Sequence, residues 1–212
     1  LLVVATGGTL IFLSGLNWKI IGAAAIAAAV AIPVALRYGL QDYQRERIFT
    51  FLNPENDPMG AGYQILQSKI ALGSGGLTGK GFLQGTQSHL NYLPEKQTDF
   101  IFTMLGEEFG FIGGIAILVL YLIVLANAVA IATSCKSTFL RMTVMGVATT
   151  FALYVIINTG MVMGMLPVVG VPLPLISHGG TVMLTVLFGF GLILGAHVHR
   201  NADLPKGAGL FG

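Results

Sequence analysis

Charged residues are missing from four long stretches of this 212-residue chain, and this limits the possible folds more than any other feature. Asp, Glu, Lys and Arg do not occur in residues 1–18, 20–36, 109–135 and 143–199. A helix that crosses a membrane needs about 20 consecutive, mostly apolar residues. Only 9% of the chain is charged, whereas a soluble domain carries about 25%. The sequence therefore predicts an all-α fold, a polytopic transmembrane helix bundle.

The apolar stretches divide into five predicted crossings, near residues 1–13, 20–36, 99–132, 142–165 and 176–198. The third is expected to be one continuous helix, long enough to protrude from the bilayer. Between the fourth and fifth, the sequence LPVVGVPLP has three prolines and a glycine, which cannot continue a helix. A tight apolar re-entrant or surface loop is expected there. Because the chain starts inside an apolar run, without Met or a basic leader, we expect a fragment of a longer membrane domain.

Basic residues indicate how the bundle is oriented. If the crossings alternate, five cations fall on one side of the membrane, namely Lys19, Lys136, Arg141, Arg200 and Lys206. The positive-inside rule makes that side cytoplasmic. The predicted organisation is therefore two transmembrane segments in 1–36, a large extracytoplasmic loop in 37–98, three transmembrane helices in 99–200 and a cytoplasmic tail in 201–212.

The extracytoplasmic loop is predicted to contain short helices. Residues 42–52 and 63–72 each place apolar side chains at helical spacing, with polar residues between them. This pattern is typical of helices that lie at the membrane interface. The glycine-rich sequence GSGGLTGKG (73–81) follows. Its glycines either allow a ligand to approach the backbone closely or only make turns.

Composition and spacing exclude several other functions. A net charge of +2 gives no basic footprint for nucleic acid. The single cysteine, Cys135, allows neither an intrachain disulfide nor a Cys-rich metal site. The glycine-rich sequence is not a P-loop, since Ser74 stands where a P-loop has Gly and Gly81 follows the lysine. We therefore expect no nucleotide cofactor.

Carboxylates are concentrated in one region, since eight of the nine acidic residues lie between positions 42 and 108. Asp99 stands where the long loop meets an apolar helix. Thr98 or Asp99 is interpreted either as the cap of that helix or, for Asp99, as a general base at the membrane surface. Glu107 and Glu108, two turns further on, are expected to be paired within the bundle or solvated in a cavity.

Four blocks of sequence occur in a recognisable order. They are GSGGLTGKG (73–81), GTQS (85–88), LPEKQTDFIF (93–102) with EEFG (107–110), and LPVVGVPLPLISHGG (166–180). Together they resemble the SEDS family (shape, elongation, division and sporulation). GTQS and the preceding QSKIA (67–71) resemble its RodA-like branch of rod elongation. The resemblance covers essentially the whole chain, as the C-terminal half of a member with ten spans. His178 departs from the pattern, because the family often has Tyr there.

The resemblance implies an enzyme in the bacterial cytoplasmic (inner) membrane. SEDS proteins are peptidoglycan glycosyltransferases of the hexosyltransferase type, and they polymerise lipid II into glycan strands on the outer face of that membrane. The family's essential acid falls on Asp99. This residue is expected to deprotonate the GlcNAc 4-hydroxyl of one lipid II, or to hold a divalent cation such as Mg²⁺ or Mn²⁺. Undecaprenyl diphosphate is the implied leaving group.

Further residues are candidates for contact with the substrate. Lys69, Lys80 and Lys96 have the charge that a diphosphate needs and lie on the predicted outer side. Glu95, Thr98 and Ser177 belong to the blocks that resemble the family. The implied partners are lipid II, the nascent glycan strand, membrane lipid and a class B penicillin-binding protein that acts as the transpeptidase.

Two other functions remain as alternatives. A lipid II flippase or other transporter would use the carboxylates as a relay through the bundle. A non-catalytic scaffold would only position a class B penicillin-binding protein. The sequence favours the polymerase, because the acids gather at the outer mouth and none occurs in the fourth or fifth crossing.

Overall fold

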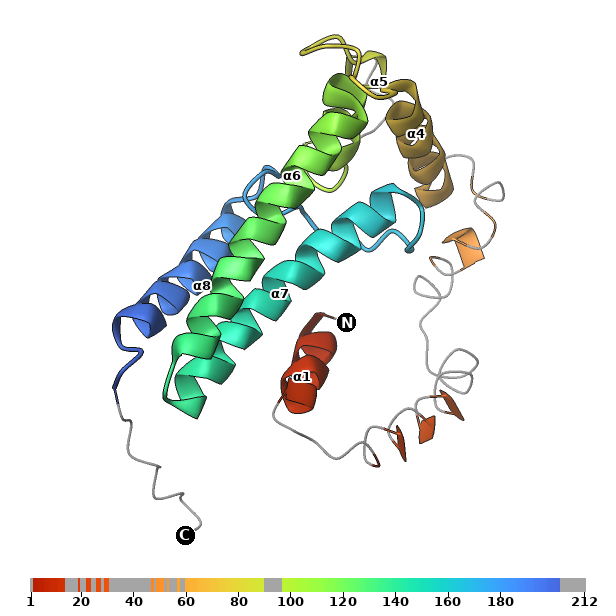
Figure 1. Ribbon diagram of the computed structural model, residues 1–212. Coiled ribbons are helices and arrows are strands. Elements are labelled where there is room, and N and C mark those ends of the chain that lie inside the picture. Colours follow the sequence, from red (N-terminus) through yellow and green to blue (C-terminus); the bar gives the residue numbers. More distant parts are fainter. Residues whose placement is uncertain are drawn as a thin grey trace.

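A computed structural model of the chain is a bundle of long helices with shorter helices at one end (Figure 1). It describes residues 2–13, 60–89 and 97–202, together with positions 19, 22–23, 26–27, 29–30, 47, 49–51, 53 and 57. The helices are α1 (Leu2–Leu13), α4 (Ala61–Ser74), α5 (Thr86–His89), α6 (Ile101–Ser134), α7 (Thr138–Val162) and α8 (Gly180–Val198). No strand occurs among the described residues, and the predicted all-α class is confirmed.

The helices α6, α7 and α8 are each long and apolar enough to cross a membrane. They occupy the third, fourth and fifth predicted crossings. Many of their large apolar side chains point away from the bundle; Leu120 on α6 is 62% exposed and Phe188 on α8 is 70% exposed. Apolar surface of this extent belongs against lipid tails, so the chain is an integral membrane protein.

The other predicted helices are found only in part. The helix α1 ends at Leu13, as expected, and lies beside α7, where the hydroxyl oxygens of Thr6 and Thr150 are 3.3 Å apart. The second predicted crossing, 20–36, lies mostly outside the described residues. The predicted helix at 63–72 is α4, which is longer by two residues at each end. Of the predicted helix at 42–52, the described positions, Arg47 and 49–51, are helical.

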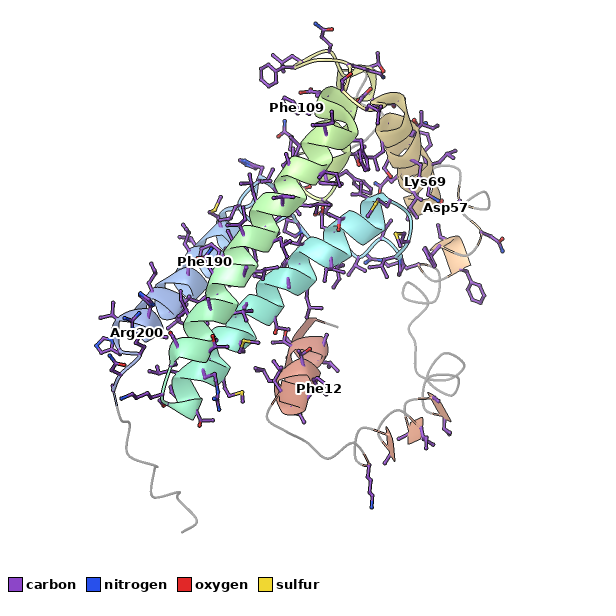
Figure 2. All side chains as sticks on the ribbon, in the orientation of Figure 1. Phe12, Asp57, Lys69, Phe109, Phe190 and Arg200 are labelled. Atoms are coloured by element: carbon purple, nitrogen blue, oxygen red, sulfur yellow. The ribbon has the colours of Figure 1, made fainter. Side chains whose placement is uncertain are left out.

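Two ends of the bundle can be distinguished by their residues. At one end α6 passes into α7 and α8 finishes; there the Lys136 N–H donates to the carbonyl of Arg200 at 3.0 Å, and Arg141 lies in the first turn of α7. We call this the basic end. The other end carries α4, α5 and the α7–α8 loop, and we call it the loop end; Phe109 and Arg200 mark the two ends in Figure 2. Lys206 lies outside the described residues.

The prediction of one continuous third helix is wrong. Gly110 has φ of +67° and ψ of −165°, which no α-helix accommodates, so α6 consists of two segments, 101–109 and 111–134. A Cβ atom at Gly114 would lie 3.5 Å from Cζ of Phe102, although these residues would be about 18 Å apart along a straight helix. The first segment therefore folds back along the second, and Gly110 forms the tip of a helical hairpin.

The glycine-rich loop 75–81 fills the gap at this tip. Two amides of the second segment, Phe111 and Ile112, donate to the carbonyls of Gly76 and Leu77 at 2.9 and 3.1 Å. In return, the amides of Lys80 and Gly81 donate to the carbonyls of Glu107 and Glu108, each at 3.0 Å. Where a helix is broken, backbone amides and carbonyls lose their intrahelical partners. The loop provides partners for four of these groups.

This close approach explains the glycines of the loop. A Cβ atom at Gly75 would collide with the carbonyl oxygen of Gly106, and one at Gly79 with that of Glu108. Gly79 also has φ of +80°, which strains any other residue. The sequence left open close approach of a ligand or turns alone; at Gly75 and Gly79 the close approach is instead to the backbone of α6.

Replacing Gly79 by Ala should destabilise the fold. The substitution combines left-handed backbone with a collision against Glu108, and we expect it to lower the free energy of unfolding by at least about 2 kcal/mol. Thermal unfolding of the full-length protein in detergent measures the change. The matched control is Gly73→Ala, which adds a methyl group within α4 where no atom lies within 4 Å; its stability should not fall. Equal melting temperatures for the two variants would contradict the proposed role of the loop.

Candidate active site at the loop end

Asp99 lies in the turn 97–100, at the open end of the helical hairpin. Its side chain is half-buried and lies close to the α7–α8 loop, since a Cβ atom at Gly170 would be 3.3 Å from Oδ2 of Asp99. The N-cap of α6 is Phe100, with no side-chain hydrogen bond. The interpretation of Thr98 or Asp99 as the helix cap is therefore not supported.

Asn158 on α7 holds the turn 97–100 in place through hydrogen bonds. Its Nδ2 donates to the backbone carbonyl of Asp99 at 2.7 Å and to that of Val171 at 2.6 Å. The Asn158 side chain is fully buried. One amide group thus joins the turn that carries Asp99 to the α7–α8 loop. Sequence reasoning missed Asn158, although an amide inside an apolar crossing is a signal for such a role.

Further hydrogen bonds join the same two segments. Ser177 Oγ donates to the carbonyl of Thr98 at 2.6 Å and accepts from the amide of Leu173 at 2.7 Å. The amide of His178 donates to the carbonyl of Gln97 at 2.8 Å. Tyr121, which sequence reasoning also missed, donates its hydroxyl to the carbonyl of Pro174 at 2.6 Å. The backbone of Asp99 is therefore held firmly while its carboxylate remains at the surface of the bundle.

The predicted loop at 166–174 is confirmed as a non-helical segment that re-enters the bundle. Leu173 and Pro174 are almost completely buried, and Leu173 packs with Phe100 and Met161 in the apolar core. A hollow of about 570 Å³ opens between residues 176–183, which follow this loop, and the turn that carries Asp99; Asp99 itself does not line it. Its lining includes Gln97, Ile101, Ile176, Ser177, His178 and Met183. The hollow gives a ligand access to the turn that carries Asp99.

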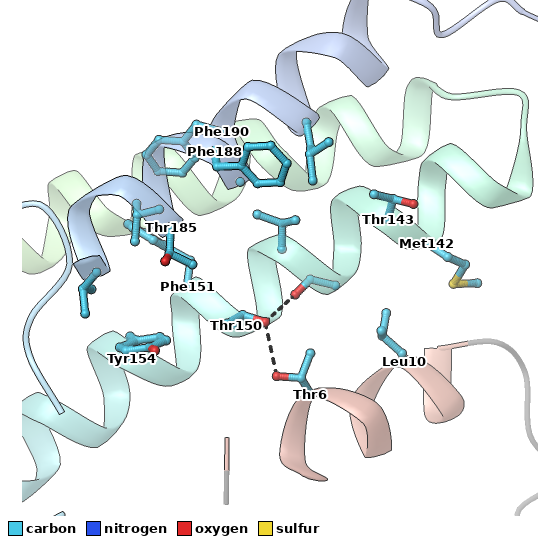
Figure 3. Close-up of a pocket in the computed structure, with 16 residues that line it drawn as sticks. Thr6, Leu10, Met142, Thr143, Thr150, Phe151, Tyr154, Thr185, Phe188 and Phe190 are labelled. Carbon is cyan, nitrogen blue, oxygen red and sulfur yellow. Dashed lines mark hydrogen bonds between the residues drawn. The ribbon is translucent and has the colours of Figure 1, made fainter. Parts of the chain in front are cut away.

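A second cavity, of about 420 Å³, lies between α1, α7 and α8 (Figure 3). Figure 3 shows the hydroxyl of Thr150 bonded to Thr6, with Tyr154 and Phe188 further along the wall. Its lining contains no carboxylate, lysine or arginine. This cavity offers no group for acid–base chemistry at neutral pH, so the candidate active site is the region around Asp99.

Lys80 and Glu107 form an ion pair next to the hairpin tip. Nζ of Lys80 is 2.7 Å from Oε1 of Glu107, and the same oxygen accepts bonds from the Thr86 hydroxyl at 3.0 Å and the Gln87 amide at 3.1 Å. The Glu107 side chain is 0% exposed, and that of Lys80 is 27% exposed. The expectation that Glu107 is paired within the bundle is met. The charge of Lys80 is thereby committed to Glu107.

The remaining predicted contact residues lie apart from this pair. Lys69 is exposed on α4 (Figure 2), and its side chain lies over Gly164, just beyond the end of α7. Its ammonium group has no hydrogen-bond or ion-pair partner in the part of the chain that the structure describes. Glu95 and Lys96 lie outside the described residues.

No cluster of three or more His, Cys, Asp or Glu side chains that would suit a metal ion occurs among the described residues. Asp99 as the ligand of a divalent cation remains a prediction. A single carboxylate is compatible with Mg²⁺, which is commonly held by one or two carboxylates together with phosphates of the substrate.

The fold and the site together define a class of protein, a polytopic helical membrane protein with a carboxylate fixed where a re-entrant loop meets the bundle. The family model for FtsW, RodA and SpoVE, described as cell cycle protein, matches residues 1–202. The chain belongs to this family, and the resemblance to SEDS proteins is confirmed.

Individual relatives agree with this assignment. The chain is 48% identical over 201 residues to the peptidoglycan glycosyltransferase MrdB of Escherichia coli strain K12. This match covers 95% of this chain and 54% of that protein. It is 41% identical over 161 residues to the peptidoglycan glycosyltransferase RodA of Treponema pallidum strain Nichols, covering 76% and 37%. The chain therefore spans about half the length of the curated relatives it matches.

A solved structure shares the fold. It is described as showing structural coordination of polymerization and crosslinking by a peptidoglycan synthase complex, and the match has a TM-score of 0.77 at 34% identity. The match covers 95% of this chain and 55% of the chain in that complex. The arrangement of the helices is thus shared with about half of a larger chain.

Removing the lysine of the buried ion pair should cost considerable stability. Lys80→Met leaves the Glu107 carboxylate buried without its cation, and we expect a loss of about 3 kcal/mol in the free energy of unfolding. The double variant Lys80→Met/Glu107→Gln should recover most of it. Thermal unfolding of the full-length protein tests both, with Lys69→Met as the exposed control, which should stay within about 0.5 kcal/mol. If Lys80→Met melts like the parent, the pair has no structural role.

Removing the Asn158 amide should loosen the Asp99 turn. Asn158→Leu leaves the carbonyls of Asp99 and Val171 without their donor, and unpaired buried groups cost about 1 to 3 kcal/mol each. The control is Asn127→Leu, because Asn127 is exposed on α6 and bonds only to Ile123 of its own helix. We expect hydrogen exchange at residues 97–101 to accelerate in Asn158→Leu alone. Unchanged hydrogen exchange at residues 97–101 would show that Asn158 does not hold the Asp99 turn in place.

Proposed function

We propose that the protein polymerises lipid II into glycan strands, as a peptidoglycan glycosyltransferase of cell elongation. The observation that carries the proposal is the position of Asp99 at one end of the bundle. Its backbone carbonyl and that of Thr98 are held by the buried side chains of Asn158 and Ser177, and its neighbours Gln97 and Ile101 line a hollow. Family membership and the names of its relatives support the same activity. The part of the protein beyond this chain would complete the site.

In the proposed reaction, Asp99 acts as general base. Its carboxylate accepts the proton of the GlcNAc 4-hydroxyl of one lipid II, and the oxygen then attacks the MurNAc anomeric carbon of the growing strand. The new glycosidic bond forms as the bond to the diphosphate breaks, with inversion at that carbon. Undecaprenyl diphosphate leaves with the bonding electron pair. If a divalent cation such as Mg²⁺ or Mn²⁺ is used, Asp99 would hold it and the cation would neutralise diphosphate charge.

The other candidate residues divide by their contacts. Ser177 and the backbone of Thr98 are engaged with each other, so Ser177 acts as a positioning residue for the Asp99 turn. Lys80 is engaged with Glu107 and serves the hairpin tip. Lys69 is the described lysine best placed for a diphosphate, because it is exposed at the loop end without a partner among the described residues. Glu95 and Lys96 remain candidates.

The charge distribution supports an orientation for the site. Lys136, Arg141 and Arg200 lie at the basic end, which the positive-inside rule assigns to the cytoplasm. Asp99 then faces the outer surface of the cytoplasmic membrane, where a lipid-linked sugar reaches it without leaving the bilayer. We further propose a class B penicillin-binding protein as partner, in line with the peptidoglycan synthase complex that shares the fold.

The described contacts favour the polymerase over a flippase. A relay across the bundle needs ionisable groups at several depths, but α7 and α8 contain no carboxylate, and Glu107 is bonded to Lys80, Thr86 and Gln87. A scaffold that only positions its partner would need no accessible carboxylate on a turn that borders a hollow. The following experiment separates these functions.

Asp99→Asn should abolish glycan synthesis without unfolding the protein. The amide cannot accept the hydroxyl proton, and removing a general base lowers a rate by about 10² to 10⁴-fold. The measurement is glycan-chain formation from labelled lipid II by the full-length protein with its transpeptidase partner in detergent. Asp203→Asn, in the predicted cytoplasmic tail, is the matched control and should polymerise like the parent.

The alternatives predict different results in the same assay. Full activity of Asp99→Asn would remove the general-base and cation-ligand roles. Translocation of lipid II in liposomes, with no polymer made by the parent protein, would instead establish a flippase. A protein that neither polymerises nor translocates lipid II, but still binds the transpeptidase, would be a scaffold.

A further inference from the structure

Arg47 occupies a position beside Asp99 that sequence reasoning did not single out. Its Nη1 donates to the carbonyls of Val168 and Val169, at 3.4 and 3.3 Å. The next residue in the α7–α8 loop is Gly170, which lies against Oδ2 of Asp99. Arg47 and Asp99, which are far apart in the chain, thus both contact the backbone of residues 168–170.

The contacts limit how far apart the two charges are. With standard backbone dimensions, Nη1 of Arg47 and Oδ2 of Asp99 can be separated by at most about 11 Å. Gly170, with φ of +75°, contributes no side chain to the space between them. The loop therefore keeps the guanidinium group within about 11 Å of the carboxylate.

The guanidinium group of Arg47 has N–H donors that these two hydrogen bonds do not use. Arginine carries five N–H donors in a rigid planar fork, and the two carbonyl bonds use only Nη1 and are long. The hydrogen bonds lie at an exposed position. The remaining donors are available for a bidentate contact with phosphate, the geometry that arginine forms most readily.

The upper limit on the spacing leaves room for the geometry of the proposed reaction, on which this inference rests. In an in-line displacement the base, the attacking oxygen, the anomeric carbon and the leaving oxygen follow one another in that order. The base oxygen is then about 8 Å from the nearest free phosphoryl oxygen, and a guanidinium donor lies about 3 Å further on. This total does not exceed the upper limit of about 11 Å that the contacts allow.

We propose that Arg47 binds the diphosphate of the growing strand and stabilises it as the leaving group. When the bond between the anomeric carbon and the diphosphate oxygen breaks, that oxygen keeps the electron pair and the diphosphate gains one negative charge. Asp99 takes the proton of the attacking hydroxyl in the same step. Arg47 donates hydrogen bonds to the diphosphate throughout and exchanges no proton.

Other cations of the described region are less suited to this position. Lys80 is paired with Glu107, and Arg141 and Arg200 lie at the basic end. Lys69 lies over Gly164, six residues before the glycine that contacts Asp99. Arg47 is the described cation whose contacts lead directly to Asp99, while Lys69 is placed to extend the same positive surface along the loop.

The test compares Arg47→Gln, Arg47→Lys and Asp99→Asn in the full-length protein with its transpeptidase partner. We expect Arg47→Gln to lower the rate of polymerisation of labelled lipid II about 100-fold, the size of effect seen when a donor to developing charge is lost. Arg47→Lys keeps the charge without the fork and should retain a larger part of the rate. Arg141→Gln, a matched substitution at the basic end, should polymerise like the parent.

A binding measurement distinguishes the proposed diphosphate subsite at Arg47 from the role of Asp99 as general base. Inorganic pyrophosphate should raise the melting temperature of the parent and of Asp99→Asn, but not that of Arg47→Gln. Parent-level polymerisation by Arg47→Gln, or equal stabilisation of it by pyrophosphate, would overturn the subsite and leave the role of Asp99 intact. Parent-level polymerisation by Asp99→Asn would instead overturn the proposed general base.

If Arg47→Gln is itself less stable than the parent, Arg47→Lys decides the matter. A folded Arg47→Lys protein with a reduced rate and weaker stabilisation by pyrophosphate would support the subsite. Full rate together with full stabilisation by pyrophosphate would show that the guanidinium fork is not required, and the assignment to Arg47 would fall.

Discussion

Four backbone hydrogen bonds between the glycine-rich loop and the break at Gly110 hold the loop end together. Backbone groups at membrane depth must find partners within the protein, because lipid offers none. The loop meets this requirement only because Gly75 and Gly79 have no side chain to keep it away from α6. The hairpin that results brings Asp99 back into the bundle, so the position of the candidate base depends on this contact.

The same requirement shapes the other irregular segment. The α7–α8 loop re-enters the bundle, where its carbonyls accept bonds from Asn158 and Tyr121 and its amide at Leu173 donates to Ser177. Two of these polar side chains also bind the Asp99 turn, directly or through Thr98. Satisfying buried backbone groups and positioning the carboxylate are therefore achieved by the same few residues.

The charged residues of the loop end serve different purposes, despite their similar appearance in the sequence. Glu107 is buried and neutralised by Lys80, which fixes the glycine-rich loop to the hairpin. Asp99 is half-buried on a turn whose residue Gln97 lines a hollow, and Arg47 is fixed to the neighbouring loop carbonyls. Complete burial marks Glu107 as a structural carboxylate, whereas Asp99 keeps part of its side chain accessible.

Sequence alone determined the membrane class, the last three apolar crossings, the helix near 63–72 and the loop at 166–174, because these depend on local composition and on residues that break helices. Its ordered motifs also singled out Asp99 as the candidate base, which stays a prediction. It did not reveal the hairpin, since an isolated Gly110 in an apolar run looks like any packing glycine. Nor did it reveal the roles of Asn158 and Arg47, or the commitment of Lys80 to Glu107. Those depend on contacts between residues far apart in the chain, and only the tertiary structure decides which distant groups meet.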